Sequence, residues 1–273
     1  MKNKYKFLIL DIDGTLTNSQ KEITPFTRQT LIDVQSQGMQ IILASGRPTY
    51  GIMPLAEKLE LERFNGYILA FNGGKIIDCQ RNEVIYEQAL PDEVLPKLYQ
   101  HTTHHGATLL SYHGSKILTE HPENEYVQYA AFLNKMEIQA THDYLNEVPS
   151  ATNKCLAAGK PEMLLELQED LSREIGEKVN SYRSEPFFLE IVPKGIDKAA
   201  SIARLLNVTH SLREETIAFG DGHNDFSMID FAGLGVAMSN AQPTLKEKAD
   251  KITCKTNDED GVAHFLLEEL DFY

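Results

Sequence analysis

The chain has 273 residues, of which 42% are hydrophobic and 24% are charged, and it carries a formal net charge of −14. This length suits one large domain or two ordinary ones, and we expect two. The 40 acidic residues outnumber the 26 basic residues, which argues against binding to nucleic acid or to an anionic membrane surface. The three cysteines are scattered and form no CxxC pair, so a reducing cytoplasm fits the chain best.

Short apolar runs alternate with helix-period segments along the chain. The first run, at 6–10, is too short for the core of a signal peptide or for a membrane span, and we expect a strand there. Thr24 and Pro25 suit the N-cap and first turn of a helix that Gly38 ends. Later runs that predict strands lie at 40–45, 67–72, 216–220 and 233–238.

A helical stripe follows the second predicted strand. Its apolar residues are Ile52, Leu55, Ala56 and Leu59, and Pro54 is tolerated only near the start of such a helix. Apolar strands that interleave with helices indicate a parallel sheet covered on both faces. The predicted fold class is therefore α/β with a Rossmann-like parallel sheet.

The segment 83–193 differs in character from the rest of the chain. Its strands alternate polar and apolar residues, it holds six of the nine histidines, and it contains an amphipathic stretch at 161–175. We expect an inserted second domain here, which leaves 1–82 and 194–273 as a first domain that is discontinuous in sequence.

Two further features have simple structural interpretations. His101, His104 and His105 have helical spacings that suit a transition metal, but without a cysteine or an evident acidic partner they fit a solvated helix end better. The acidic run at 257–260 is interpreted as a loop that caps a final helix at 261–270.

Two aspartates end the first predicted strand. Asp11 and Asp13 are alternate residues, so both carboxylates project to the same side at the carboxyl edge of the sheet. That edge is where open parallel sheets bind ligands. The bare pattern fits an Asx-turn equally well.

Ser45, Gly46 and Arg47 end the second predicted strand. A hydroxyl and unhindered backbone N–H groups at the start of a helix form a small anion cradle. A plain turn explains this tripeptide alone more simply, and Arg47 equally suits a structural ion pair.

Polar residues mark two later element ends. Lys198 lies in the first turn of a predicted helix, where a cation opposes the helix dipole at a cost of up to about 1 kcal/mol unless an anion is nearby. A solvated lysine that tolerates this penalty is the alternative. The sequence GDGHND at 220–225 places Asp221, Asn224 and Asp225 at the end of another apolar strand.

Together these residues indicate phosphoryl chemistry. Ser45, Lys198 and Asn224 can hold phosphoryl oxygens, and an aspartate can act as a nucleophile that forms an acyl phosphate. If the first and fourth strands are neighbours, their acids form an oxygen-rich cluster of the kind that selects Mg²⁺. The acids of this cluster are Asp11, Asp13, Asp221 and Asp225.

The motifs DIDGTL, ASGR, PKGIDK and GDGHND occur in this order. With them the whole chain resembles the haloacid dehalogenase superfamily of phosphohydrolases, in its Cof-type branch with a class IIB cap inserted after the third core strand. The resemblance implies a Rossmann-like core at 1–82 and 194–273 and an α/β cap at 83–193 that determines substrate specificity. It also implies a cytoplasmic, Mg²⁺-dependent phosphatase for phosphate monoesters of small metabolites, as a monomer or homodimer. Sugar phosphates are favoured, beside nucleotides and phosphorylated cofactors.

The resemblance assigns roles to the motif residues. Asp11 would be the nucleophile that attacks phosphorus, and Asp13 the acid that protonates the leaving alcohol and then activates water. Mg²⁺ would contact the Asp11 carboxylate, the Asp13 backbone carbonyl and the Asp221 carboxylate, with Asp225 as an outer contact. The implied phosphate-binding groups are the backbone N–H groups near Ile12 and Gly46 and the side chains of Ser45, Lys198 and Asn224.

Other functions fit parts of the sequence. A metal-dependent glycosyltransferase would explain Asp11-Ile12-Asp13 but would leave Lys198 and 220–225 without a role. A phosphomutase of the same superfamily would share the aspartyl-phosphate and return the phosphoryl group to a sugar. A sensor would bind a phosphorylated metabolite without turnover, but the presence of both aspartates disfavours it because sensing needs no acid.

Overall fold

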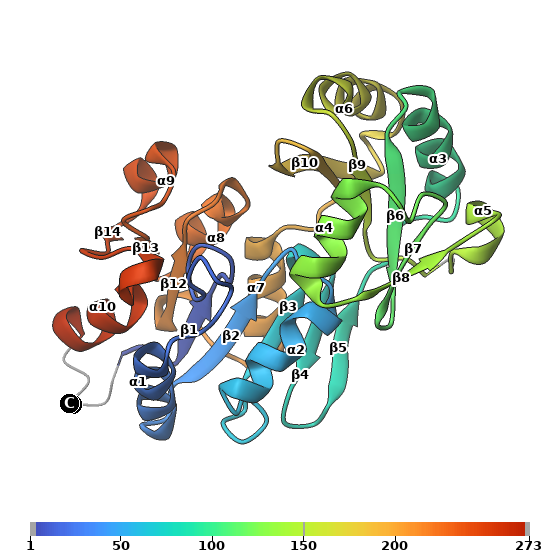
Figure 1. The fold of residues 1–273 in the computed structure, drawn as a ribbon. Helices are drawn as coiled ribbons and strands as arrows, with labels where there is room; N and C mark the ends of the chain where they lie inside the picture. Colours follow the sequence, from blue (N-terminus) through green and yellow to red (C-terminus); the bar gives the residue numbers. More distant parts are fainter. Residues whose placement is uncertain (1–3, 150, 271–273) are drawn as a thin grey trace. The chain divides into compact units, whose positions relative to one another are not determined.

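A computed structural model of the protein (Figure 1) describes residues 4–149 and 151–270. The chain forms two compact units: unit 1 is Met1–Gly46, Ile52–Tyr86 and Asp197–Tyr273, and unit 2 is Arg47–Gly51 and Glu87–Ile196. The limits expected from the sequence, 82/83 and 193/194, lie a few residues earlier. The first limit differs because strand β5 (Glu83–Glu87) joins the sheet of unit 1.

Unit 1 is built on an eight-stranded sheet. The strands are β1 (Phe7–Leu10), β2 (Gln40–Ala44), β3 (Tyr67–Ala70), β4 (Lys75–Asp78), β5 (Glu83–Glu87), β12 (Thr216–Gly220), β13 (Leu234–Ala237) and β14 (Lys251–Ile252). Their order is β14-β13-β12-β1-β2-β3-β4-β5. Neighbours from β14 to β3 are parallel, as predicted, whereas β4 pairs antiparallel with β3. Strand β1 therefore lies between β2 and β12, which makes the first and fourth predicted strands neighbours.

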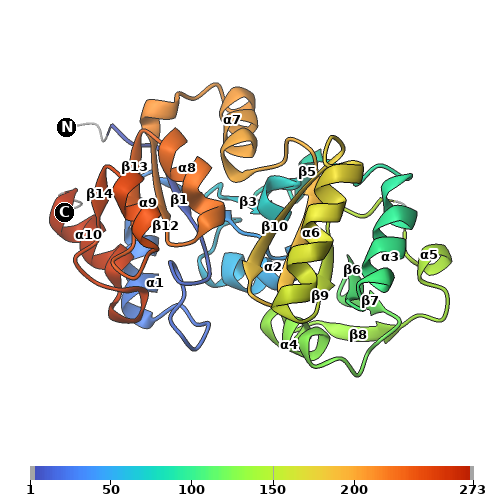
Figure 2. The same ribbon diagram turned by 90° about the horizontal axis from the view of Figure 1, so that it is seen from above.

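Helices cover both faces of this sheet, with α7 (Lys198–Val208) and α8 (Phe226–Phe231) on one face and α1 (Pro25–Ser36) and α10 (Gly261–Glu269) on the other (Figure 2). Helix α1 begins as predicted, because the side chain of the N-cap Thr24 accepts a hydrogen bond from the Thr27 N–H. Unit 1 also contains α9 (Pro243–Lys248) and the 3₁₀ turns Phe71–Gly73, Arg213–Glu215, His223–Asp225 and Asn257–Glu259.

Helix α2 (Thr49–Lys58) begins earlier than the apolar stripe indicates. Pro54 consequently lies in the helix interior, so the expectation that it would fall near the start is wrong. The stripe begins only at Ile52, so it did not indicate the first turn, which holds Thr49, Tyr50 and Gly51. Residues Ile52–Lys58 of this helix belong to unit 1, and its first turn is grouped with unit 2.

The acidic run before α10 has a different contact from the one predicted. Asp260 occupies the N-cap position of α10 but makes no side-chain capping bond there. Its carboxylate instead accepts hydrogen bonds from the hydroxyls of Thr24 and Thr27, at the start of α1. Asp258 likewise accepts from the backbone N–H and the hydroxyl of Ser19, both at 2.6 Å. The acidic run therefore links the segment before α10 to Ser19 and to the start of α1.

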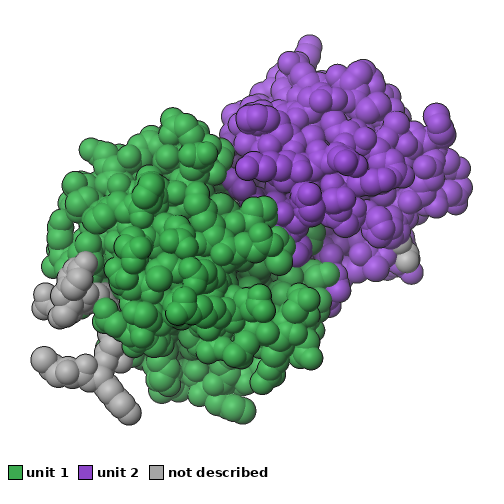
Figure 3. Space-filling view, turned by 60° about the horizontal axis from the view of Figure 1, so that its bottom comes forward, with its two compact units in different colours: residues 1–46, 52–86, 197–273 green, residues 47–51, 87–196 purple. Residues whose placement is uncertain are grey.

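Unit 2 (purple in Figure 3) is built on a six-stranded sheet in the order β10-β11-β9-β6-β7-β8. One face packs on α3 and α6 through a buried core that includes Leu98, Leu164 and Leu171. The other face packs on α4 through a smaller core that includes Leu110 and Val127. The strands are β6 (Thr108–His113), β7 (Lys116–Thr119), β8 (Glu137–Ala140), β9 (Cys155–Ala158), β10 (Val179–Glu185) and β11 (Phe188–Pro193). The helices are α3 (Val94–His104), α4 (Glu125–Asn134), α5 (Tyr144–Glu147) and α6 (Pro161–Ile175).

The histidines at the end of α3 have acidic partners that the sequence did not reveal. His105 Nε2 lies 2.8 Å from Asp170 Oδ2, and His101 Nε2 lies 3.2 Å from Glu174 Oε2. Both acids lie on α6, more than sixty positions further along the chain. The interpretation of a solvated helix end is therefore wrong for these two histidines.

Within the described ranges, no helix combines the length and the apolarity needed to cross a bilayer.

Gly73 fixes the turn that follows β3. Its φ of +96° is unfavourable for other residues, and an added Cβ would lie 2.1 Å from Ser201 Oγ on α7. We expect Gly73→Ala to lower the free energy of unfolding by about 2–4 kcal/mol, because backbone strain and overpacking combine. Urea denaturation measures this loss.

Gly38 offers a matched control for this substitution. Its φ is +100°, but an added Cβ would meet nothing within 4 Å. Gly38→Ala should therefore show the backbone cost alone, about 1–2 kcal/mol. Equal losses in the two variants would contradict close packing between Gly73 and α7.

Candidate active site

Three parallel strands bring polar residues to one edge of the unit 1 sheet. Leu10, the last residue of β1, pairs in register with Leu43 of β2 and Phe219 of β12. Asp11 follows β1 directly and Asp221 follows β12 directly. Since parallel strands share a carboxyl edge, these two acids are neighbours there although 210 positions separate them.

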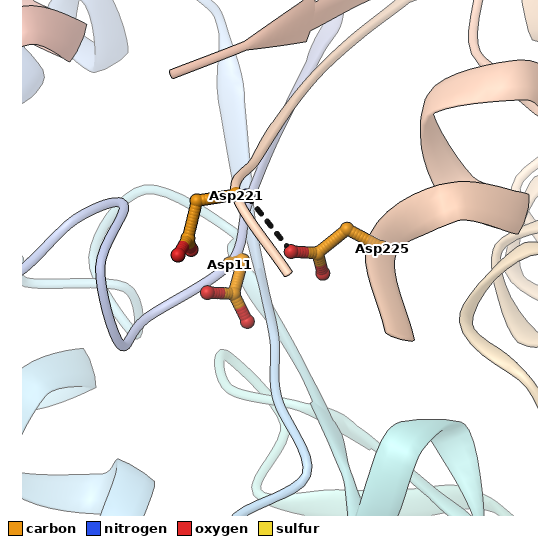
Figure 4. A group of neighbouring side chains, drawn as sticks. All are labelled: Asp11, Asp221 and Asp225. Atoms are coloured by element: carbon orange, nitrogen blue, oxygen red, sulfur yellow. Dashed lines mark hydrogen bonds between the residues drawn. The ribbon is translucent and has the colours of Figure 1, made fainter. Parts of the chain in front are cut away.

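Three carboxylates form a cluster at this edge (Figure 4). Asp11, Asp221 and Asp225 each place an oxygen within 4.8 Å of the others. Burial and then the charge of Asp225 hold the pKa of Asp11 well above its usual range. The same two causes raise the pKa of Asp221 to about 7. Without a compensating cation, the folded protein therefore resists full ionisation of the cluster.

Lys198 supplies part of the compensating charge. It is the first residue of α7, is fully buried, and its Nζ lies 2.6 Å from Asp11 Oδ1 and 2.6 Å from Asp225 Oδ1. Burial alone would lower the pKa of Lys198, but the two carboxylates raise it above its usual value. The alternative of a solvated lysine is wrong, and the anions near this helix start are the two aspartates.

Asp225 organises the loop that follows β12. Its Oδ2 accepts hydrogen bonds from the backbone N–H groups of Asp221 and Gly222, both at 2.9 Å. Gly220 leaves room for this arrangement, because an added Cβ would lie 2.6 Å from the Asp225 Cβ. With Lys198 on its other oxygen, Asp225 is held on both sides and in turn fixes the backbone of Asp221.

The Asp13 side chain lies outside the carboxylate cluster. Its Oδ1 forms an ion pair with Lys21 Nζ at 2.9 Å, and 36% of the side chain is exposed. Gly14 turns the chain there with a φ of +83°, and an added Cβ would lie 2.4 Å from Asp221 Oδ2. The turn is closed where the Thr17 N–H donates to the carbonyl oxygen of Ile12 at 2.9 Å. Asp11 and Asp13 thus share a loop but occupy different environments.

Ser45 and Asn224 lie at the same sheet edge and are linked through Asn72. Ser45 directly follows β2 and is buried, and its carbonyl oxygen accepts from the Asn72 N–H at 2.9 Å. The side-chain amide of Asn224 donates to Asn72 Oδ1 at 3.2 Å. Gly46 follows Ser45 in a bend, and Arg47 Nη1 donates to the Gly51 carbonyl oxygen at 3.3 Å.

Several residues at this edge were missed in the sequence. Asn72 is buried with a φ of 57°, and the sequence placed it only at the end of the strand expected at 67–72. Thr15 donates through its hydroxyl to Asp221 Oδ1 at 2.9 Å. Asn240 and Asn257 donate to the carbonyl oxygens of Gly14 and Thr17, at 2.8 and 2.9 Å. Strand-end position would have singled out Asn72, but no sequence signal marks the other contacts.

The cluster fits a hard divalent cation. Carboxylate oxygens are the ligands that such ions prefer, and Asp11 and Asp221 have raised pKa values that a nearby cation would lower. Within the described part of the chain, the residues that form a potential metal-binding group are Asp11, Asp221 and Asp225. The Asp13 side chain, which the sequence grouped with them, is paired with Lys21 instead.

Comparisons with known proteins agree with this architecture. The sequence model of the haloacid dehalogenase-like hydrolases matches residues 8–266. The Bacillus subtilis protein named 5-amino-6-(5-phospho-D-ribitylamino)uracil phosphatase YcsE is 30% identical over 271 residues, which cover 96% of each chain. The solved structure of a haloacid dehalogenase-like hydrolase from Bacteroides thetaiotaomicron is 50% identical, with a TM-score of 0.93 over 97% of this chain and 99% of the other.

A second solved structure, named as the HAD subclass IIB sugar phosphatase BT4131, is 26% identical with a TM-score of 0.82 over 98% of this chain and all of the other. These matches confirm the predicted α/β fold class. They also confirm the family resemblance that the four motifs indicated. The chain therefore belongs to the haloacid dehalogenase-like hydrolase family and is a phosphatase enzyme of that family.

Proposed function

We propose that the protein hydrolyses phosphate monoesters of small metabolites, with sugar phosphates favoured, through an aspartyl-phosphate on Asp11 and with Mg²⁺ as cofactor. The observation that carries the proposal is the buried Lys198, which joins Asp11 and Asp225 beside Asp221 at the carboxyl edge of a parallel sheet. The names of the two phosphatase relatives support the substrate class, since a ribityl chain and a sugar are both polyhydroxylated.

In the first step, a carboxylate oxygen of Asp11 attacks phosphorus and the bond from phosphorus to the alcohol oxygen breaks. Asp13 gives its proton to that oxygen, so a neutral alcohol leaves. In the second step, Asp13 takes a proton from water, the water oxygen bonds to phosphorus, and the bond to Asp11 breaks.

The remaining residues position charge. Lys198 fixes the orientation of the Asp11 carboxylate through Oδ1 and can share its charge with a phosphoryl oxygen. Ser45, Asn224 and the backbone N–H groups near Ile12 and Gly46 are the proposed donors to the other phosphoryl oxygens. Mg²⁺, held by Asp11, Asp221 and the Asp13 backbone with Asp225 behind them, would neutralise negative charge on the phosphoryl group. We propose that unit 2 recognises the leaving alcohol.

The proposal is tested by phosphate release from para-nitrophenyl phosphate, and then from a panel of sugar phosphates, nucleotides and phosphorylated cofactors. We expect release that requires Mg²⁺, stops with EDTA, and is fastest for a member of the sugar phosphate group. Covalent ³²P labelling of the protein, lost in Asp11→Asn, is expected for rapidly quenched reactions.

Three results would contradict the proposal. Isomer formation without net phosphate release would identify a phosphomutase. Metabolite binding without turnover would identify a sensor. Turnover of a nucleotide-sugar without monoester hydrolysis would favour the glycosyltransferase that the Asp11-Ile12-Asp13 triplet also allows.

A further inference from the structure

Lys21, which lies outside the four motifs, forms an ion pair with Asp13. Its Nζ is 2.9 Å from Asp13 Oδ1, and the two side chains are 38% and 36% exposed. Both residues belong to unit 1, and the chemistry proposed above uses Asp13 but not Lys21. An exposed pair of this kind adds at most about 1 kcal/mol to stability. The orientation of Asp13, by contrast, matters directly for proton transfer.

The backbone of Lys21 is held in a strained conformation. Its φ is +62°, in the left-handed region, which costs a residue with a Cβ roughly 1–2 kcal/mol. Asn18 closes the turn, since its side-chain oxygen accepts hydrogen bonds from the N–H groups of Gln20 and Glu22, both at 3.0 Å. Its carbonyl oxygen accepts from the Lys21 N–H at 2.9 Å. Strain of this kind persists where surrounding contacts determine the turn, and here the turn directs Lys21 to Asp13.

The same loop is anchored to a distant part of unit 1. The carboxylate of Asp258 accepts hydrogen bonds from the backbone N–H and the hydroxyl of Ser19, both at 2.6 Å. The side-chain amide of Asn257 donates to the carbonyl oxygen of Thr17 at 2.9 Å. Two anchors therefore lie between Asp13 and its lysine partner in the chain, so the loop presents the lysine from a fixed backbone.

The contact with Lys21 distinguishes the two carboxylate oxygens of Asp13. A lysine ammonium only donates hydrogen bonds, and it bonds to Oδ1, which leaves Oδ2 as the oxygen that takes up a proton. A charge-assisted bond of this kind is strongest with an ionised carboxylate. The ionised carboxylate is the form of Asp13 that takes a proton from water in the second proposed step. The pair therefore suits the second step better than the first.

The place of Asp13 outside the carboxylate cluster fits this step as well. Attacking and leaving oxygens lie roughly in line on opposite sides of phosphorus, so the water approaches on the side away from Asp11. A base that contacts this water has to lie apart from Asp11. The acids whose oxygens lie within 4.8 Å of one another are Asp11, Asp221 and Asp225.

We infer that Lys21 is a positioning residue for the second step, because it holds Asp13 Oδ1 so that Oδ2 takes a proton from the attacking water. The water oxygen bonds to phosphorus, the bond from phosphorus to the Asp11 oxygen breaks, and inorganic phosphate leaves with the second proton of the water. This inference rests on the proposed function, since it concerns hydrolysis of the same aspartyl-phosphate.

The test is a single-turnover reaction of ³²P-labelled para-nitrophenyl phosphate with excess enzyme and Mg²⁺, stopped by rapid quenching. Nitrophenolate release measures the first step, which needs little help from an acid because this leaving group is a weak base. Release of inorganic phosphate from the labelled protein measures the second step. In Lys21→Met we expect the second rate constant to fall about 10- to 30-fold, which is part of the roughly 10²- to 10⁴-fold contribution of a general base. The first rate constant should stay within about twofold, so labelled protein accumulates.

Two variants serve as controls. Lys21→Arg keeps a cation in the loop and should restore most of the second rate constant. Lys251→Met breaks an exposed ion pair with Glu269 in the same unit and should leave both steps unchanged.

Equal loss of both steps in Lys21→Met would overturn the inference, because a purely structural role slows them together. An unchanged or faster second step would also overturn it, since the lysine would then be idle or would hold Asp13 away from the water. If wild type releases no phosphate from the aryl phosphate, the proposed function is judged separately on the substrate panel. Crystal structures of wild type and Lys21→Met then decide the inference, since an Asp13 carboxylate that changes position in the variant supports it and one that stays in place refutes it.

Discussion

Asp11→Asn is expected to lower kcat for phosphate release by about 10⁴-fold or more, because an amide cannot replace the carboxylate as the nucleophile. The variant should nevertheless fold. Asp11 is one of three clustered acids, and burial and the charge of Asp225 already disfavour its ionised form. The activity is measured as Mg²⁺-dependent phosphate release, and the fold by thermal unfolding in EDTA.

The pH dependence of this thermal unfolding follows from the raised pKa of Asp11. An aspartate carboxyl in the unfolded chain ionises at about pH 4, whereas the folded protein keeps the Asp11 proton to a higher pH. Between these two pKa values the folded state holds more protons, so the stability of the metal-free wild type falls as pH rises. The Asp11→Asn variant has no such proton to lose, so its stability should fall less steeply as pH rises.

Asp230→Asn is the matched control for Asp11→Asn. Asp230 lies on α8 of the same unit, where its exposed carboxylate pairs with Lys248. We expect the kcat of Asp230→Asn to stay within about twofold of wild type, as for surface substitutions away from a site. Substantial activity in Asp11→Asn would mean that Asp11 is not the nucleophile, and loss of activity in Asp230→Asn would mean that the effect is not specific to the site.

Lys198→Met is expected to destabilise the protein and to abolish activity. It removes the cation that lies 2.6 Å from both Asp11 and Asp225 and leaves their charges buried without it. Loss of one member of a buried ion pair costs about 3–5 kcal/mol. The free energy of unfolding, measured by urea denaturation without metal, should fall by this amount, and Mg²⁺ should restore part of it.

The double variant Lys198→Met/Asp225→Asn separates charge from packing. It removes one of the two buried aspartate charges along with the lysine, so we expect it to be more stable than Lys198→Met yet equally inactive. The exposed pair of Lys248 and Asp230 supplies the control, since Lys248→Met should cost at most about 1 kcal/mol. A loss in Lys198→Met no larger than in Lys248→Met would show that Lys198 does not stabilise the cluster.

The sequence predicted the part of the site that depends on local pattern. Apolar strands that end in Asp11 and Asp221 indicated the sheet edge, and the stripe after Lys198 indicated a helix that starts there. These features follow from side-chain periodicity, which the chain expresses over a few residues. The parallel sheet then brings the strand ends together, whatever their separation in sequence.

Contacts between distant segments could not be predicted in this way. The partners of His101 and His105 lie on α6, and the contact between Lys154 and Glu190 requires the strand order of unit 2. No sequence pattern indicated that Lys21 would pair with Asp13, because both lie in a loop without periodic pattern. Such contacts depend on tertiary packing, which local propensity does not determine.

The position of β1 between β2 and β12 has a consequence for how the protein folds. Its pairing with β12, like the bond from Lys198 to Asp11 across 187 positions, joins segments that the ribosome makes far apart in time. All six strands of the unit 2 sheet are synthesised in between, as one continuous segment. Because nearby segments pair faster than distant ones, the unit 2 sheet can form while β1 still has one unpaired edge. The newly made chain thus exposes an apolar strand until β12 emerges, which makes this interval its period of greatest risk of aggregation.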